Sequence, residues 1–193
     1  MGSKLPTLCA ALLLTLTACS SAAPAEVTPS PAFSPAPSEQ AQFGVLSSFS
    51  ATDLEGNPVD QSILSGCDLT MVNVWGTFCP PCKEEMPYLA ELHEEYAGRG
   101  FQIVGLVSDV LNQDGSINQD QVASAREIAQ ATGADYLHLL PSEDLFFLLS
   151  QVYALPSTFF VDSEGNQIGS LHLGMKTKEQ WAALIEEMLE EVS

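Results

Sequence analysis

The segment that decides the fold is residues 75–82, which read WGTFCPPC. It follows an apolar run over 69–74, which predicts a buried strand, and it precedes a segment with the features of a helix. Two cysteines three residues apart on the first turn of a helix can close a small disulfide, and the positive end of the helix favours a thiolate on the first of them. The sequence therefore predicts dithiol–disulfide exchange with Cys79 as the reactive thiol.

Two other interpretations of the cysteine pair remain open at this point. A Cys-x-x-Cys pair is half of a typical zinc site, but His93, His138 and His172 are scattered without partners at short spacing, so zinc is the weaker alternative. A purely structural disulfide is the other alternative, because an extracellular chain tolerates one, although so small a loop would constrain the unfolded chain little.

Pro80 and Pro81 bear on the direction of the reaction. Both suit the opening turn of a helix, but neither carries a backbone N–H. A thiolate on Cys79 then loses two hydrogen-bond donors and accepts mainly from the N–H of Cys82. Since a strong oxidant owes its strength to a stabilised reduced form, the Cys-Pro-Pro-Cys sequence favours a reductant.

Residues 1–18 are predicted to be a secretory signal. Lys4 precedes an apolar stretch over 5–18, and these 14 residues are fewer than the ~20 that a membrane-spanning helix needs. With the residues LTAC at 16–19, the stretch resembles bacterial lipoprotein signals, which implies cleavage before Cys19 and acylation of its thiol. A plain secretory signal cut nearby is the alternative.

Residues 19–42 are interpreted as the lipidated cysteine and a tether, because they are rich in proline, alanine and serine and have little that could form a core. Residues 43–193 remain as one domain. Without Glu26, Glu39 and Lys4, the chain's 25 acidic and 6 basic residues leave 23 and five in this domain, a net charge of −18. This excess argues against nucleic acid as a partner and against a polybasic membrane patch.

The domain is predicted to alternate strands and helices. An opening hairpin is expected near 46–59, and further strands are expected over 69–75, 101–107, 136–140, 158–161 and 167–173. Helices are expected over 80–96, kinked at Pro87 and closed by Gly98, and over 120–132, 143–153 and 178–192. This order implies some parallel pairing and a mixed sheet with helices on both faces.

Two further features are predicted to carry no chemistry. The loop 110–115 fails the calcium-loop template, because Val110 would stand at the first ligand position and Gln121 at the twelfth. Cys67 and Cys79 lie on opposite sides of a strand that spans about 20 Å, too far for a disulfide. Cys67 is therefore interpreted as a small buried apolar residue.

Several separated motifs agree in order: the strand, the Cys-Pro-Pro-Cys sequence, the helix, and the residues LPST at 155–158 before a strand and a hairpin. Together they resemble the thioredoxin superfamily, and within it the TlpA-type and ResA-type group of membrane-tethered thiol–disulfide oxidoreductases. The resemblance covers nearly all of 43–193. It implies an α/β, thioredoxin-like fold with a central mixed β-sheet flanked by helices, an N-terminal hairpin, and a helix–strand insertion between Ser108 and Leu140.

The resemblance also implies roles for single residues. Cys79 would be the attacking thiol and Cys82 the resolving thiol. Pro156 matches the family's cis-proline, which faces the disulfide, and Leu155 would offer its backbone to a bound substrate strand. Phe78 and Pro80, on either side of Cys79, complete the expected substrate contacts.

Three positions near the motif differ from the best-known thioredoxins or need a separate interpretation. Asn73 stands six residues before Cys79, where thioredoxins carry an aspartate as a buried proton acceptor, so another group must move the proton. Glu85 stands where ResA-like proteins carry an active-site acid or base, and its alternative is an ordinary first-turn carboxylate that complements the helix dipole. Phe78 replaces the usual tryptophan and keeps an apolar rim, while Trp75 is expected to be a buried aromatic under the active-site turn.

The resulting hypothesis is an extracytoplasmic reductase of protein disulfides, lipid-anchored to the bacterial cell membrane, with the Cys79–Cys82 disulfide in place of any cofactor or metal. By resemblance, its substrates would be apocytochrome c haem-site disulfides or oxidised repair enzymes, and its electrons would come from a membrane thiol carrier. The alternatives are an oxidase of the same fold, a non-catalytic binding or metal-carrier lipoprotein, and a peroxidase. The peroxidase is disfavoured by its resemblance pattern. Peroxiredoxins carry Thr-x-x-Cys, with threonine three residues before the reactive cysteine, whereas Thr77 stands only two residues before Cys79.

Overall fold

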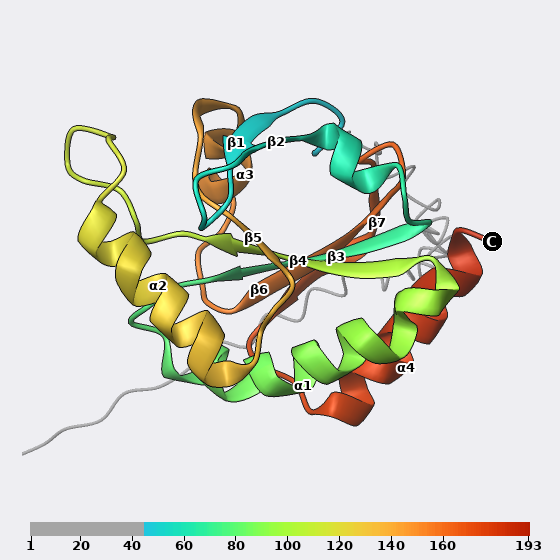
Figure 1. Ribbon diagram of the computed structural model, residues 1–193. Coiled ribbons are helices and arrows are strands. Elements are labelled where there is room, and N and C mark those ends of the chain that lie inside the picture. The colour runs from blue at the N-terminus through green and yellow to red at the C-terminus, as the bar shows by residue number, and fades with distance from the viewer. Residues whose placement is uncertain (1–44) are drawn as a thin grey trace, which may run out of the picture. The chain divides into compact units, whose positions relative to one another are not determined.

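Strand β3 (Leu69–Trp75) lies in the middle of the sheet, and helix α1 (Pro80–Tyr96), which follows it, covers one face of the sheet (Figure 1). The structure is a computed structural model that describes residues 45–193, so the predicted signal, Cys19 and the tether lie outside the described residues. Every residue of β3 is buried, because the strand is the middle one of a five-stranded sheet of order β5-β4-β3-β6-β7. An unbroken apolar run is typical of a strand that is covered on both faces.

The other strands make the sheet mixed, as predicted. Strand β4 (Phe101–Val107) is parallel to β3, and β5 (Leu137–Leu139) is parallel to β4. Strand β6 (Ser157–Asp162) is antiparallel to β3, and β7 (Gln167–Leu173) is antiparallel to β6. Trp75 pairs with Val107 and Val74 pairs with Ser157, so the end of β3, the end of β4 and the start of β6 meet at one edge.

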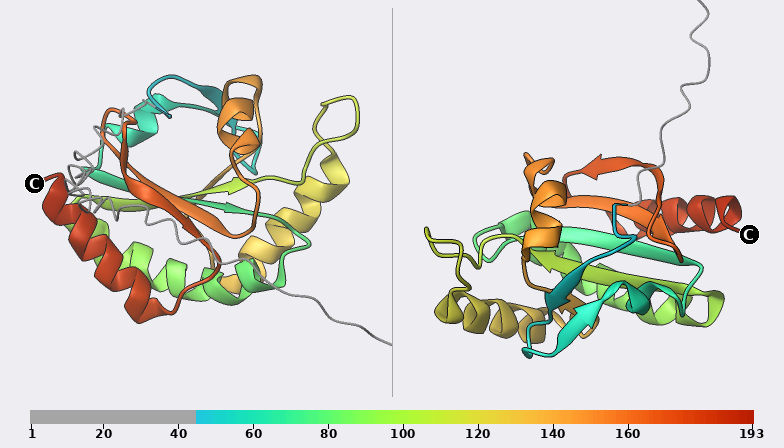
Figure 2. Two further views of the ribbon diagram at one scale, coloured as in Figure 1. Left: turned by 180° about the vertical axis from the view of Figure 1, so that it is seen from behind. Right: turned by 90° about the horizontal axis from the view of Figure 1, so that it is seen from above.

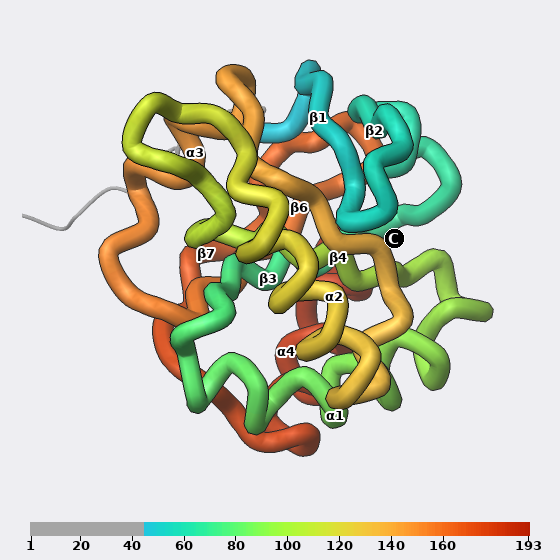
Figure 3. Tube along the Cα trace, turned by 60° about the vertical axis from the view of Figure 1, so that its left-hand side comes forward, coloured from blue at the N-terminus to red at the C-terminus, as the bar shows by residue number. Residues whose placement is uncertain are grey.

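The two faces of the sheet are covered unequally (Figures 1 and 2). Helix α1 shares one face with α2 (Gln119–Thr132) and α4 (Lys178–Glu191), and Figure 3 shows these three helices grouped together. The other face carries short elements: the hairpin of β1 (Ser50–Thr52) and β2 (Pro58–Asp60), the 3₁₀ helix η1 (Gln61–Leu64), and α3 (Phe146–Ser150).

A separate apolar core lies on each side of the sheet. The core under the long helices includes Trp75, Met86 and Trp181, and the core under the short elements includes Val74 and Leu145. The predicted α/β class, hairpin and helix–strand insertion, now α2 and β5, are confirmed. Among residues 45–193, no helix has the length and apolar character needed to cross a membrane.

Two predicted boundaries were wrong. The helix expected over 143–153 is a 3₁₀ turn, η3 (Glu143–Leu145), followed by α3, which ends at Ser150. The chain then runs towards Pro156 without helical structure. Gly98 does not close α1. The helix tightens into η2 (Ala97–Arg99), and Gly100, with φ of 73°, takes the left-handed position instead.

Candidate active site

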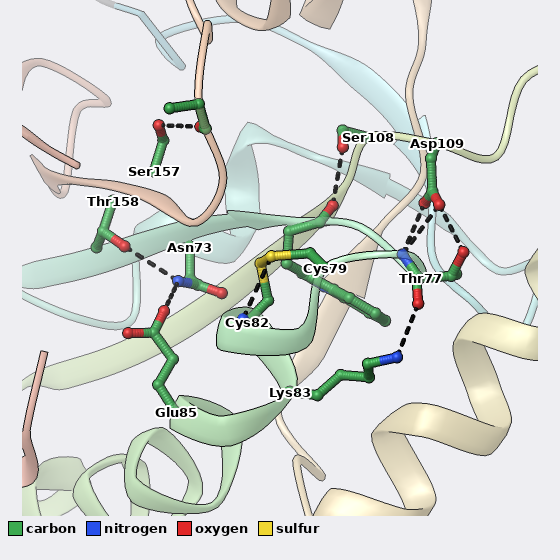
Figure 4. The surroundings of a disulfide bond; sticks show 12 residues. Asn73, Thr77, Cys79, Cys82, Lys83, Glu85, Ser108, Asp109, Ser157 and Thr158 are labelled. Atoms are coloured by element: carbon green, nitrogen blue, oxygen red, sulfur yellow. Dashed lines mark hydrogen bonds between the residues drawn. A yellow bond between two sulfur atoms is a disulfide. The ribbon is translucent and has the colours of Figure 1, made fainter. Parts of the chain in front are cut away.

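Cys79 and Cys82 form a disulfide at the N-terminus of α1, with Cα atoms 5.3 Å apart (Figure 4). Cys79 is the N-cap residue, and its Sγ accepts a hydrogen bond from the backbone N–H of Cys82 at 3.3 Å. Pro80 and Pro81 fill the first two helical positions and have no N–H to donate. Cys82 therefore supplies the donor that the two prolines cannot.

The two sulfur-bearing residues differ in access. Cys79 is 4% exposed and Cys82 is 0% exposed. An open pocket of about 560 Å³ lies over Cys79, and Cys82 is not among the residues that line it. A second molecule can therefore approach this disulfide through the pocket and meets Cys79 first.

The wall of this pocket is mostly apolar. It includes Phe78 and Tyr153, which are 69% and 79% exposed, and the remaining lining comes from Pro80, Pro81, Ser108, Leu149, Val152, Ala154 and Leu155. The structure thus brings Phe78, Pro80 and Leu155 together beside Cys79. The Leu155–Pro156 peptide bond is cis. The substrate contacts expected of Phe78, Pro80, Leu155 and Pro156 stay predictions.

Sequence reasoning missed Leu149, Val152 and Tyr153 as parts of this pocket. The sequence pattern places all three in one helix over 143–153, whereas the structure ends the helix at Ser150, so Val152 and Tyr153 lie beyond its end. The signal that could have identified them is their position just before Leu155, which was itself an expected substrate contact.

Glu85 lies on the inner side of α1 and is 0% exposed. Its Oε1 accepts from Asn73 Nδ2 at 3.0 Å, and its Oε2 accepts from Trp181 Nε1 and from the backbone N–H of Lys176, both at 3.2 Å. Burial raises the pKa of Glu85, although these hydrogen bonds and the charge of Lys176 oppose the rise. A buried carboxyl group with a raised pKa is suited to exchange a proton closer to neutral pH.

The alternative interpretation of Glu85 does not hold, because α1 has no acidic residue in its first turn. Glu85 is instead fixed by partners on β3 and α4, as the close-up in Figure 4 shows for its side towards Asn73. Its proposed exchange of a proton with the thiols stays a prediction.

Asn73 connects Glu85 to the strand that follows Pro156. It is fully buried, and its Nδ2 donates to Glu85 Oε1 and to Thr158 Oγ1, both at 3.0 Å. Within residues 45–193, Asn73 Oδ1 has no hydrogen-bond partner. An amide does not titrate, so Glu85 is the ionisable member of this buried group.

Trp75 is a buried core aromatic, as expected. Its Nε1 donates to His138 Nδ1 at 3.2 Å, and His138 Nε2 lies 3.0 Å from the carbonyl oxygen of Ala134. Burial lowers the pKa of His138 to about 4, so the ring is neutral and its proton lies on Nε2. A Cβ on Gly105 would stand 2.0 Å from His138 Nδ1, so glycine makes room for this ring beneath the active-site turn.

Cys67 lies before β3, at the end opposite Cys79. It is a free thiol and only partly buried, which corrects the prediction of a fully buried residue. Partial burial and the charge of Asp68 raise the pKa of the Cys67 thiol, which lowers the fraction present as thiolate.

Comparison with known proteins finds relatives among thiol–disulfide oxidoreductases. The family model for the AhpC/TSA family matches residues 45–166. The chain is 30% identical over 145 residues to the thiol-disulfide oxidoreductase ResA of Bacillus thuringiensis subsp. konkukian (strain 97-27), which covers 75% of each chain. It is 29% identical over 132 residues to ResA of Bacillus thuringiensis (strain Al Hakam), covering 68% of this chain and 69% of that one.

A solved structure shows the same fold. The crystal structure of a thiol:disulfide interchange protein of the thioredoxin family from Chlorobium tepidum TLS superimposes with a TM-score of 0.60 at 24% identity. The superposition covers 74% of this chain and 93% of that chain. The thioredoxin-like fold predicted from the sequence is confirmed.

Proposed function

The chain belongs to the AhpC/TSA family of the thioredoxin superfamily and is a thiol–disulfide oxidoreductase, and we propose that it works in the reducing direction, passing two electrons to disulfides of other proteins. One observation carries the direction: Cys79 Sγ accepts from the N–H of Cys82, while Pro80 and Pro81 offer no donor. A thiolate with little stabilisation gives a reducing couple. The test is the equilibrium of this couple with glutathione buffers.

The proposed reaction has two exchange steps. The Cys79 thiolate attacks one sulfur of the substrate disulfide, so that a Cys79–substrate bond forms, the substrate S–S bond breaks, and the second substrate sulfur leaves as a thiolate and takes up a proton. Cys82 then loses its proton and attacks Cys79 Sγ. The Cys79–Cys82 bond forms, and the first substrate sulfur leaves as a thiolate that is protonated.

Overall, two electrons and two protons pass to the substrate, and the protein is left with the Cys79–Cys82 disulfide. Glu85 is the group proposed to accept the proton of Cys82, because it is the buried carboxyl group one helical turn further along α1. A dithiol carrier must then reduce the disulfide again for the next cycle.

We place the protein outside the cytoplasm, anchored by a lipid on Cys19. The support is the sequence of residues 1–19, which has the length, the apolar character and the terminal cysteine of a lipoprotein signal. In that location, a membrane thiol carrier is the proposed electron donor. The proposed substrates are the haem-site disulfides of apocytochrome c or oxidised repair enzymes.

The pocket over Cys79 is proposed to receive an apolar side chain of the substrate beside its cysteine. Tyr153→Ala should then lower kcat/KM about tenfold for a disulfide peptide that carries leucine next to its cysteine, because a large aromatic contact is lost. The rate with glutathione disulfide should not change. Stopped-flow fluorescence with both oxidants would measure the two rates.

Tyr88→Ala is the matched control, because Tyr88 is an exposed aromatic residue on α1 that does not line the pocket. An equal loss with the peptide and with glutathione disulfide would show that Tyr153 acts on the thiols and not on substrate binding.

A further inference from the structure

Asp109 holds the residue two positions before Cys79. It lies just after β4, and its carboxylate accepts the backbone N–H of Thr77 at 3.1 Å on Oδ1 and 2.9 Å on Oδ2. The hydroxyl of Thr77 donates to the same Oδ2 at 2.5 Å. Figure 4 shows this contact on one side of the disulfide and Glu85 on the other. Hydrogen bonds to a carboxylate are about twice as strong as those between neutral groups.

The hydroxyl oxygen and the carbonyl oxygen of Thr77 also accept hydrogen bonds, each from a different helix. Gln121 Nε2, on α2, donates to Thr77 Oγ1 at 2.9 Å. Lys83 Nζ, on α1, donates to the carbonyl oxygen of Thr77 at 3.1 Å. Next to Asp109, the backbone N–H and the hydroxyl of Ser108 both donate to the carbonyl oxygen of Trp75 at 2.9 Å. The turn from Trp75 to Cys79 is therefore held by hydrogen bonds at two residues, Trp75 and Thr77.

The carboxylate of Asp109 is held by neutral donors. Among residues 45–193, the ion pairs join Arg99 to Glu186 and Lys178 to Glu91 and Glu95, and none reaches Asp109. Three of the hydrogen bonds to the Asp109 carboxylate come from Thr77 in the active-site turn, and a fourth, at 3.4 Å, comes from Gln121 Nε2 on α2, so the position of Asp109 is coupled to that turn.

Access to Cys79 makes this turn sensitive to position. Cys79 is 4% exposed, so a substrate reaches its sulfur only from the side of the pocket. Exchange requires the three sulfur atoms to come into line, and a misplacement of about 1 Å can cost up to about a hundredfold in rate. A free Thr77 would let Cys79 move away from that line.

We propose that Asp109 is a positioning residue for the exchange reaction: it fixes Thr77 and thereby the turn that presents Cys79, and the inserted helix α2 supports this contact through Gln121. The inference rests on the dithiol–disulfide activity of the proposed function and not on its direction. It assigns a role in the reaction to the segment between β4 and β5.

The experiment compares Asp109→Ala, Asp109→Asn and Thr77→Val, which keeps the N–H and loses the hydroxyl. The rates to measure, on the reduced full chain, are alkylation of Cys79 by iodoacetamide across pH and exchange with glutathione disulfide. Asp109→Ala should slow exchange about tenfold, and Asp109→Asn, which keeps an acceptor oxygen, should stay within about threefold of the unaltered protein. Thr77→Val should slow exchange less in the Asp109→Ala background than alone.

Asp114→Ala is the matched control. Asp114 makes the same kind of contact, accepting from the N–H of Ser116 at 3.0 Å and from its hydroxyl at 2.6 Å, but at the exposed tip of the loop. It should leave both rates unchanged.

Three results would overturn the proposal. The first is a lowered melting temperature for Asp109→Ala with unchanged rates in the folded protein, which would make Asp109 only structural. The second is an equal loss of exchange rate in Asp109→Asn and Asp109→Ala, which would assign the effect to the negative charge of Asp109. The third is an equal loss in Asp114→Ala. An oxidising potential in the unaltered protein would contradict only the proposed direction.

Discussion

Replacing Cys79 with serine is expected to abolish disulfide reduction, with a loss of at least about 10³-fold, whereas Cys82→Ser is expected to stop the reaction at a mixed disulfide. Cys79 is the cysteine that lines the pocket, and a serine hydroxyl does not replace a thiolate as the nucleophile. Cys82 is 0% exposed and bonded to Cys79, which supports its proposed role of releasing the substrate. Mass spectrometry of the Cys82→Ser protein should show one substrate molecule per chain, released by dithiothreitol.

Cys67→Ser is the control, because Cys67 lies at the far end of β3. It should reduce substrate at the unaltered rate. An adduct on Cys67, or turnover that persists in Cys79→Ser, would contradict the assignment of Cys79 as the attacking thiol.

Glu85→Gln is expected to slow the release step about 10²-fold at neutral pH, at the lower end of the range for general acid–base catalysis. In the proposed mechanism, the carboxylate form of Glu85 accepts the proton of Cys82, so the rate should rise with pH through the raised pKa of Glu85. The substituted protein should lose this part of the pH–rate profile. Single-turnover kinetics from the mixed disulfide between pH 4 and 9 would measure it.

The pH dependence of stability gives a second readout for Glu85. Because the folded-state pKa of Glu85 is raised above its unfolded value, the stability contributed by its neutral form is fully present below the unfolded pKa and is lost as pH rises through the folded pKa. The Glu85→Gln protein should not show this loss in urea unfolding. The new amide fits, because Asn73 Oδ1 has no partner within residues 45–193 and can accept from it after a rotation of the Asn73 amide.

Glu84→Gln is the control for both readouts, since Glu84 is the exposed neighbour on the same helix. A pH–rate profile in Glu85→Gln that matches the unaltered one would remove Glu85 from the mechanism. So would an equal slowing by Glu84→Gln.

The central strand and its helix could be predicted from the sequence because their signals are local. The apolar run of β3 marks a strand covered on both faces, and Pro80 and Pro81 after Cys79 mark the start of a helix. Helix α3 could not be placed as well, because consecutive apolar residues over 145–149 fit a helix of any length in that region.

The parts of the site that sequence reasoning missed depend on contacts between distant segments. Asp109 reaches Thr77 across 32 residues, and Trp181 reaches Glu85 across 96. Nothing near Asp109 in the sequence distinguishes it from other loop carboxylates, and nothing near Glu85 distinguishes a buried acid from a solvated one. The three-dimensional fold determines both the contact of Asp109 with Thr77 and the burial of Glu85.

The reduction potential of the Cys79–Cys82 couple tests the central claim most directly. The purified protein would be equilibrated in defined glutathione or dithiothreitol buffers, and the fraction of free thiol would be measured by alkylation and mass spectrometry. A reductase predicts a potential near that of thioredoxin, about −270 mV, or lower. A value near about −120 mV, typical of a strong disulfide-donating oxidant, would contradict the account and reverse the direction of the reaction.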